Sequence, residues 1–221
     1  MAFLSDITMY WDEYIPDDES TRLRTAANYI CDFYHKMLAD YKPPKTSRIC
    51  IHLNAEHLNK QNYCGSICQI NGRFEANKFF GNSKHEQYKY LVTVLHESLL
   101  RTAGIYNWND KPFINAYEAV CSSGFLFALV YPSKKSRDRK KCAQISINKT
   151  ETETIITLSL TIENKTDNIK LLESRNFYWY DPAYFIAKAS KWLGNEKFGV
   201  FNQKNGKFLF YSLTENSVMC E

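Results

Sequence analysis

At 221 residues, the chain is long enough for one large domain or two small ones. With 44% hydrophobic and 15% aromatic residues it is a globular sequence, which excludes an intrinsically disordered chain. The net charge of +4 is mild, and we expect its distribution along the chain to matter more than its sum.

The N-terminal part begins acidic and continues as a helix. Positions 6–19 hold no Lys or Arg, and the acidic residues that we treat as a candidate partner-binding segment are Asp12, Glu13, Asp17, Asp18 and Glu19. Apolar residues then recur at helical spacing from Ser20, the expected N-cap, to about Asp40. A short strand is expected over Arg48–Leu53.

A hairpin and a long helix are predicted next. Asn71-Gly72 is a dipeptide that accepts the two positive φ angles of a type I′ turn, so it predicts a hairpin with strands Ser66–Ile70 and Arg73–Ala76. Helical spacing then resumes from Ser83 to Ala103, and Gly104 is the expected stop.

A third helix, an apolar strand and a basic loop follow. Asp110 is expected to cap the helix, which ends at Gly124. Phe125–Tyr131 is apolar at nearly every position, which indicates a strand covered on both faces. The loop after Tyr131 holds six cations, which we treat with this tyrosine as a candidate partner-binding surface: Lys134, Lys135, Arg137, Arg139, Lys140 and Lys141.

The last third of the chain is rich in strands. Strands are expected over Cys142–Asn148, Thr154–Ile162 and Asn168–Leu172, the second of which alternates regularly. A helix is expected from Asp181-Pro182 to Leu193, with Gly194 as its stop.

The chain closes on a second predicted hairpin. Its strands are Phe198–Phe201 and Phe208–Ser212, and its turn is Asn205-Gly206. Together the elements predict an α+β fold: a helix-rich N-terminal half with a small β-meander, then a largely antiparallel sheet with one further helix. We expect a single domain over residues 1–221, and two subdomains would meet near residues 132–142.

No segment carries a complete metal or catalytic motif. One short stretch holds four residues that could bind zinc, with spacing that matches no standard site: His52, His57, Cys64 and Cys68. His96-Glu97 begins like a zinc-protease helix, but the position of the second histidine holds Leu100. We expect no metal, no cofactor and no catalytic residue.

The cysteines and the N-terminus predict a cytoplasmic protein. Seven cysteines, an odd number, lack the spacing of a disulfide framework, which favours free thiols in a reducing compartment. Positions 1–10 show no basic region followed by an apolar run, so no signal peptide is expected. No apolar stretch approaches the ~20 residues of a membrane-spanning helix, so we expect no membrane partner.

The basic loop admits two classes of partner. Its cations could contact nucleic-acid phosphates, but the chain has no nucleic-acid-binding motif, so we favour an acidic protein surface. The expected aromatic anchors near the loop include Tyr178 and Trp179. The alternative is an enzyme or nucleic-acid-processing protein whose site is assembled from scattered residues.

Residues 90–116 read YLVTVLHESLLRTAGIYNWNDKPFINA and resemble immunity proteins of bacterial polymorphic toxin systems. The C-terminal segment FGVFNQKNGKFLFYS also resembles these immunity proteins. The resemblance implies a cytosolic, non-enzymatic protein that binds a toxin and neutralises it by stoichiometric occlusion. It carries over no individual binding residue.

Overall fold

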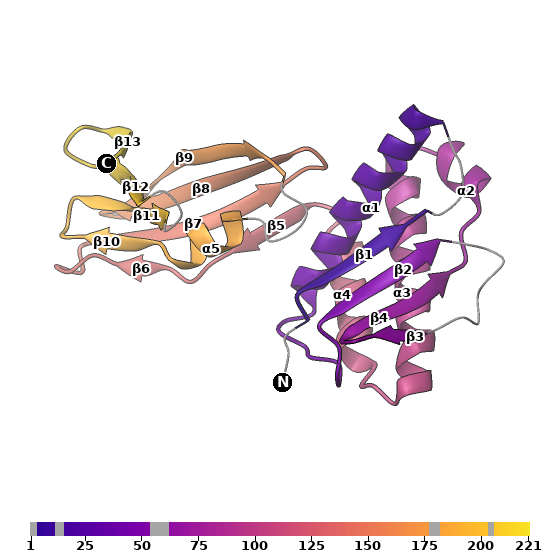
Figure 1. Cartoon of the computed structure of the whole chain (residues 1–221). Helices are drawn as coiled ribbons and strands as arrows, with labels where there is room; N and C mark the ends of the chain where they lie inside the picture. The colour runs from indigo at the N-terminus through magenta and orange to yellow at the C-terminus, as the bar shows by residue number, and fades with distance from the viewer. Residues whose placement is uncertain (1–3, 12–15, 54–61, 177–181, 203–205) are drawn as a thin grey trace. The chain divides into compact units, whose positions relative to one another are not determined.

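The computed structural model of the chain describes residues 4–11, 16–53, 62–176, 182–202 and 206–221. The chain divides into two compact units, Met1–Leu126 (unit 1) and Phe127–Glu221 (unit 2). Both units combine helix and strand, which confirms the predicted α+β class (Figure 1). Residues 132–142 lie inside unit 2.

Unit 1 is built on a four-stranded sheet in the order β1-β2-β4-β3 (Figure 1). The strands are β1 (Asp6–Tyr10), β2 (Arg48–Leu53), β3 (Asn62–Cys64) and β4 (Ile67–Gly72). β1, β2 and β4 run parallel, and β3 is antiparallel to β4. Because α1 (Asp17–Met37) connects the parallel neighbours β1 and β2, these three elements form a βαβ unit.

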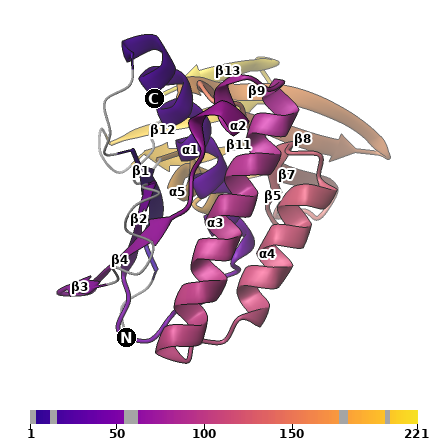
Figure 2. The ribbon, with the colours of Figure 1, turned by 90° about the vertical axis from the view of Figure 1, so that its right-hand side faces the viewer.

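Long helices cover one face of this sheet. α1, α3 (Lys84–Tyr106) and α4 (Lys111–Ser122) pack against one another, and Figures 1 and 2 show α3 and α4 side by side on one side of the strands. A short helix, α2 (Ala76–Phe80), precedes α3. By register, one face of the sheet carries the buried apolar residues: Ile7, Met9, Ile49, Ile51, Leu53, Cys68 and Ile70.

Two helix boundaries differ from the prediction: the start of α1 and the end of α3. α1 begins three residues before Ser20, because acidic side chains in its first turn favour the N-terminal helix dipole. α3 begins next to Ser83, close to the predicted start, and Ser83 caps it by accepting a hydrogen bond from the Glu86 backbone N–H. Gly104 does not stop α3, since the left-handed cap is Asn107.

The predicted hairpin at Asn71-Gly72 is wrong. β4 runs straight through both residues and pairs in parallel with β2, and the strand that is antiparallel to it precedes it. Gly72 does not have a positive φ. A Cβ atom there would lie 3.0 Å from Ile51 Cγ2 and 3.1 Å from Ser98 Oγ. Its missing side chain therefore allows α3 to approach the sheet.

Unit 2 contains two antiparallel sheets and one short helix. The first sheet has the order β5-β7-β8-β9, with β6 also paired to β7, and the second has the order β10-β11-β12-β13. The elements of the first sheet are β5 (Phe127–Val130), β6 (Lys134–Lys135), β7 (Lys141–Lys149), β8 (Glu153–Ile162) and β9 (Lys165–Arg175). The remaining elements are α5 (Pro182–Lys188), β10 (Lys191–Leu193), β11 (Lys197–Asn202), β12 (Lys207–Ser212) and β13 (Ser217–Cys220).

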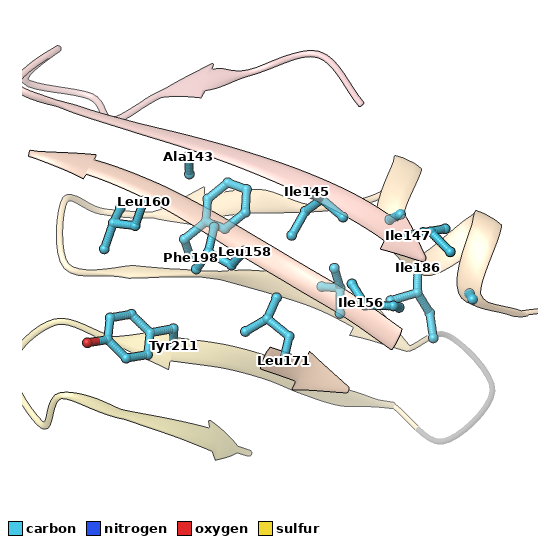
Figure 3. Packing of buried hydrophobic residues seen from close by; sticks show 13 residues of the cluster. Ala143, Ile145, Ile147, Ile156, Leu158, Leu160, Leu171, Ile186, Phe198 and Tyr211 are labelled. Atoms are coloured by element: carbon cyan, nitrogen blue, oxygen red, sulfur yellow. The ribbon is translucent and has the colours of Figure 1, made fainter. Parts of the chain in front are cut away.

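The core of unit 2 lies between its two sheets (Figure 3). Figure 3 shows Ile145 of β7 and Leu158 of β8 pointing toward Phe198 of β11. Ile186 of α5 packs into one end of the same cluster. The alternating apolar residues predicted for Thr154–Ile162 therefore point into the core between the two sheets of a sandwich.

Three predictions for unit 2 have mixed outcomes. The hairpin of β11 and β12 is confirmed, although its predicted turn lies largely outside the described residues. Phe125–Tyr131 is not covered on both faces, because Ala128 and Val130 share one face of β5 and are exposed, Val130 to 65%. The predicted helix to Leu193 ends at Lys188, since Gly194 turns the chain so that β10 pairs with β11.

Gly199 of β11 allows close approach to β12. A Cβ atom there would collide with the Leu209 carbonyl oxygen and would lie 2.6 Å from Phe210 Cβ. Gly199→Ala should therefore destabilise the protein by about 3 kcal/mol, as measured by chemical denaturation. The control is Gly104→Ala in α3, where the added Cβ atom meets nothing within 4 Å. The higher helix propensity of alanine should there stabilise the protein by up to ~1 kcal/mol. Equal effects of the two substitutions would contradict this reading.

Tyr34 and His96 connect the helices of unit 1. The Tyr34 hydroxyl donates its one proton to the Phe113 carbonyl oxygen at 2.7 Å. It must then accept from the Nδ1–H of His96 at 2.9 Å. The His96 ring also stacks on Tyr117 with ring centroids 4.3 Å apart. One hydroxyl therefore joins α1, α3 and α4.

Acidification should destabilise the fold, because it places a positive charge on the partly buried His96 ring. Burial lowers the pKa of His96 below 6.5, while Glu97 and Glu118 oppose the shift. As the pH falls, the unfolded chain takes up a proton at His96 before the folded chain does, so stability falls. The free-energy advantage of the wild type over His96→Gln should shrink between about pH 7 and about pH 5. A difference that stays constant across this range would show that His96 does not titrate as described.

Candidate functional site

The acidic segment has a structural explanation in unit 1. Asp12 and Glu13 lie outside the described residues. Asp17, Asp18 and Glu19 form the first turn of α1, where carboxylates stabilise the positive end of the helix dipole. The structure therefore gives Asp17, Asp18 and Glu19 a role at the start of α1.

The residues considered for zinc do not converge. In β3 and β4, Cys64 pairs with Ile67 and Tyr63 pairs with Cys68, so Cys64 and Cys68 point to opposite faces of the sheet. His57 lies outside the described residues. Within the described part of the chain, no three His, Cys, Asp or Glu side chains are arranged to hold a metal ion.

A polar cluster covers part of the sheet face opposite to α3 and α4. Arg48 Nη2 lies 3.3 Å from Asp6 Oδ2 and donates to the Tyr10 hydroxyl at 3.0 Å. The pair Thr8–Cys50 lies between these positions in the register, so the Arg48 side chain passes over it. Burial raises the pKa of Asp6 to about 6, although Arg48 opposes the shift. Because Cys50 is buried, this cluster offers no accessible thiol.

The basic segment in unit 2 is an ordered hairpin. β6 pairs with β7, and the turn between them is held by hydrogen bonds to Ser136 and Asp138. The Ser136 hydroxyl donates to Asp138 Oδ1 at 2.6 Å and accepts from the Lys141 N–H at 3.1 Å. The Ser136 hydroxyl, and then the Lys140 N–H, lower the pKa of Asp138. The cations are therefore displayed on a defined backbone.

Two of the six cations make internal contacts. The Lys134 ammonium group donates to the carbonyl oxygens of Lys188 and Ser190 and to the Ser190 hydroxyl, at the C-terminal end of α5. Burial lowers the pKa of Lys134. Lys141 Nζ contacts the Asn195 carbonyl oxygen at 2.9 Å and Glu196 Oε1 at 2.6 Å. The hairpin is thus fastened to residues 188–196.

The other four cations of the hairpin face solvent. This fastening also brings two exposed lysines, one at the end of α5 and one in β10, beside the hairpin. Across the described residues, these four hairpin side chains and the two lysines beside them form no ion pair. We call them together the basic surface: Lys135, Arg137, Arg139, Lys140, Lys188 and Lys191.

Exposed apolar residues accompany the basic surface. Phe185 is 49% exposed and precedes Lys188 by three residues on α5, so both lie on one side of the helix. Leu193 is 38% exposed and points to the same side of β10 as Lys191. Sequence reasoning missed both, although the Phe-x-x-Lys spacing is a visible signal.

The predicted aromatic anchors are placed differently. Tyr131 is half-buried, packs on the core of unit 2 and reaches the Tyr184 carbonyl oxygen at 3.5 Å. It therefore supports the fold beneath the hairpin. Tyr178 and Trp179 lie outside the described residues.

Comparisons of the chain with protein-family models, with curated proteins and with solved structures find no match. Among the residues that the structure describes, no helix has the length and apolar character needed to span a membrane.

The two adjacent lysines of β6 should differ in their effect on stability. Lys134→Met removes the donor for the Ser190 and Lys188 carbonyl oxygens and should cost about 1–2 kcal/mol in chemical denaturation. Lys135→Met, at an exposed position, should change stability by less than ~0.5 kcal/mol. If both substitutions have the same effect, Lys134 does not fasten the hairpin.

Proposed function

We propose that this chain is a binding protein whose basic surface docks on an acidic surface of a protein partner. The observation that carries the proposal is the fastened hairpin, in which Lys134 and Lys141 fix the backbone. The remaining cations then form no ion pair among the described residues. A protein that needed these lysines and arginines only for solubility would not require a fixed turn beneath them.

The electrostatics suit rapid, oriented association. Charges farther apart than ~8 Å are largely screened at physiological salt, so closely spaced cations contribute most to the local field. Such a field steers a complementary partner and raises its association rate. Asp138 offsets only one of these charges, since its ionised carboxylate is bound by the turn beside Lys140, and the surface keeps an excess of cations.

Phe185 and Leu193 supply exposed apolar surface beside the cations. Interfaces combine apolar or aromatic anchors with a charged rim, and the anchors contribute most of the affinity. The expected partner therefore presents carboxylates around one or two apolar pockets. A bare phosphate backbone would use the cations but would leave both apolar side chains in water.

The partner that we propose is a toxin that the chain neutralises by occlusion, as in immunity proteins. Support comes from the resemblance of residues 90–116, which form most of α3 and the first half of α4. This role requires binding without catalysis. The ordered basic surface and the buried thiol of the polar cluster are consistent with it.

The test begins with the gene neighbourhood: a toxin domain encoded immediately upstream of this gene supports the proposal and serves as the binding partner, and a gene without such a neighbour leaves the toxin role without support. A variant with Gln at Lys135, Arg137, Arg139 and Lys140 should associate ~10–100-fold more slowly at low salt than the wild type, with a flatter salt dependence. Surface plasmon resonance measures the rate, and survival of cells that express the toxin measures neutralisation.

A control variant separates the basic surface from net charge. Gln at Lys45, Lys89, Lys111 and Lys165 removes the same charge from exposed positions spread over both units, and it should leave the association rate nearly unchanged. Equal slowing by both variants, or charge-dependent binding of duplex DNA in place of a protein, would overturn the proposal.

A further inference from the structure

β13 is an unprotected edge of the second sheet of unit 2. Among the strands that the structure describes, it pairs only with β12, and it is the outermost strand of its sheet in Figure 1. All four of its residues are exposed, including Val218 at 38% and Met219 at 41%. Free strand edges readily pair with another strand, and proteins commonly block them with charged residues.

The other edges of the sandwich include charged strands. β9 carries charges along its length, among them Lys165, Asp167 and Lys170, and β10 carries Lys191. β13 reads Ser-Val-Met-Cys and carries no charged side chain. Pairing at β13 therefore brings no like charges together.

The hydrogen bonds of β12 show which backbone groups of β13 are free. Phe208 and Glu221 exchange both of their N–H···O bonds, at 2.7 and 3.1 Å. Hydrogen-bonded and non-hydrogen-bonded pairs alternate along an antiparallel ladder, so Phe210–Met219 is bonded in the same way and Tyr211–Val218 is not. The N–H and C=O groups of Val218 and Cys220 consequently point away from β12.

We infer that β13 pairs with β13 of a second copy of this chain, forming a two-fold symmetric dimer. In an antiparallel arrangement, Val218 exchanges both hydrogen bonds with Cys220 of the second copy, and Cys220 does so with Val218 of that copy. Met219 then faces its own counterpart across the symmetry axis as a non-hydrogen-bonded pair. This register satisfies every outward group identified above on both copies.

The surroundings of β13 leave room for this pairing. A groove of about 570 Å³ lies alongside, lined by residues 165–169 of β9, Tyr211 of β12 and residues 216–218. The basic surface includes Lys191 of β10, at the opposite edge of the same sheet. The two basic surfaces therefore lie at the far ends of a continuous sheet in the dimer, where they do not repel each other and can engage two partners.

Disulfide trapping tests the register. In a Cys64→Ser/Cys220→Ser background, which removes the exposed cysteines, Met219→Cys should yield a cross-linked dimer when oxidised glutathione is added. Ala128→Cys, an exposed position in the uncharged edge strand β5, is the matched control and should not cross-link. Equal cross-linking at both positions, or none at Met219→Cys, would overturn the proposed register.

Sedimentation velocity over a wide concentration range tests the dimer itself. Because the pairing strand is short, we expect a reversible dimer that forms as the protein concentration rises. Met219→Lys places two ammonium groups opposite each other and should abolish the dimer. Leu193→Lys, at a similarly exposed position in β10, should retain it. A wild type that is monomeric at all concentrations, or a Met219→Lys dimer as stable as the wild type, would refute the inference without bearing on the basic surface.

Discussion

The candidate binding surface depends on how the chain uses one of its own cations. The Lys134 ammonium group satisfies carbonyl oxygens at the C-terminal end of α5, where a positive charge also complements the helix dipole. The Trp192 indole N–H donates to the Lys134 carbonyl oxygen at 2.8 Å, so backbone and side chain of the same residue are both held. This contact places the basic hairpin beside β10.

The sandwich of unit 2 explains why that arrangement persists. Its two sheets bury apolar residues against each other, and α5 closes one end of the cluster. Hydrogen bonds to such a core hold hairpins and helix ends at its margin in a fixed position. The same architecture leaves edge strands exposed, and the charges on β9 contrast with the bare edge of β13.

Unit 1 uses polar groups in a different way. Its helices are joined through the Tyr34 hydroxyl, and the opposite face of its sheet is covered by Arg48 between Asp6 and Tyr10. In both clusters burial shifts a pKa value, that of Asp6 in one and that of His96 in the other. Each of these side chains has a partner within unit 1 and contributes to its packing. Perturbed titratable groups therefore do not by themselves mark an active site here.

The amino-acid sequence by itself determined the features that depend on neighbouring residues. The α+β class, the strand Arg48–Leu53, the start of α3 near Ser83 and the hairpin of β11 and β12 all follow from short-range periodicity and turn chemistry. The concentration of cations at 134–141 was equally visible.

Only the tertiary structure decided what depends on residues far apart. Gly72 serves the approach of α3 to the sheet, and the same Asn-Gly dipeptide would serve a turn in another context. Likewise, Lys134 and Lys135 are indistinguishable in the sequence. One is fastened to residues more than fifty positions away and the other is exposed, because burial and hydrogen bonding are set by which segments the fold brings together.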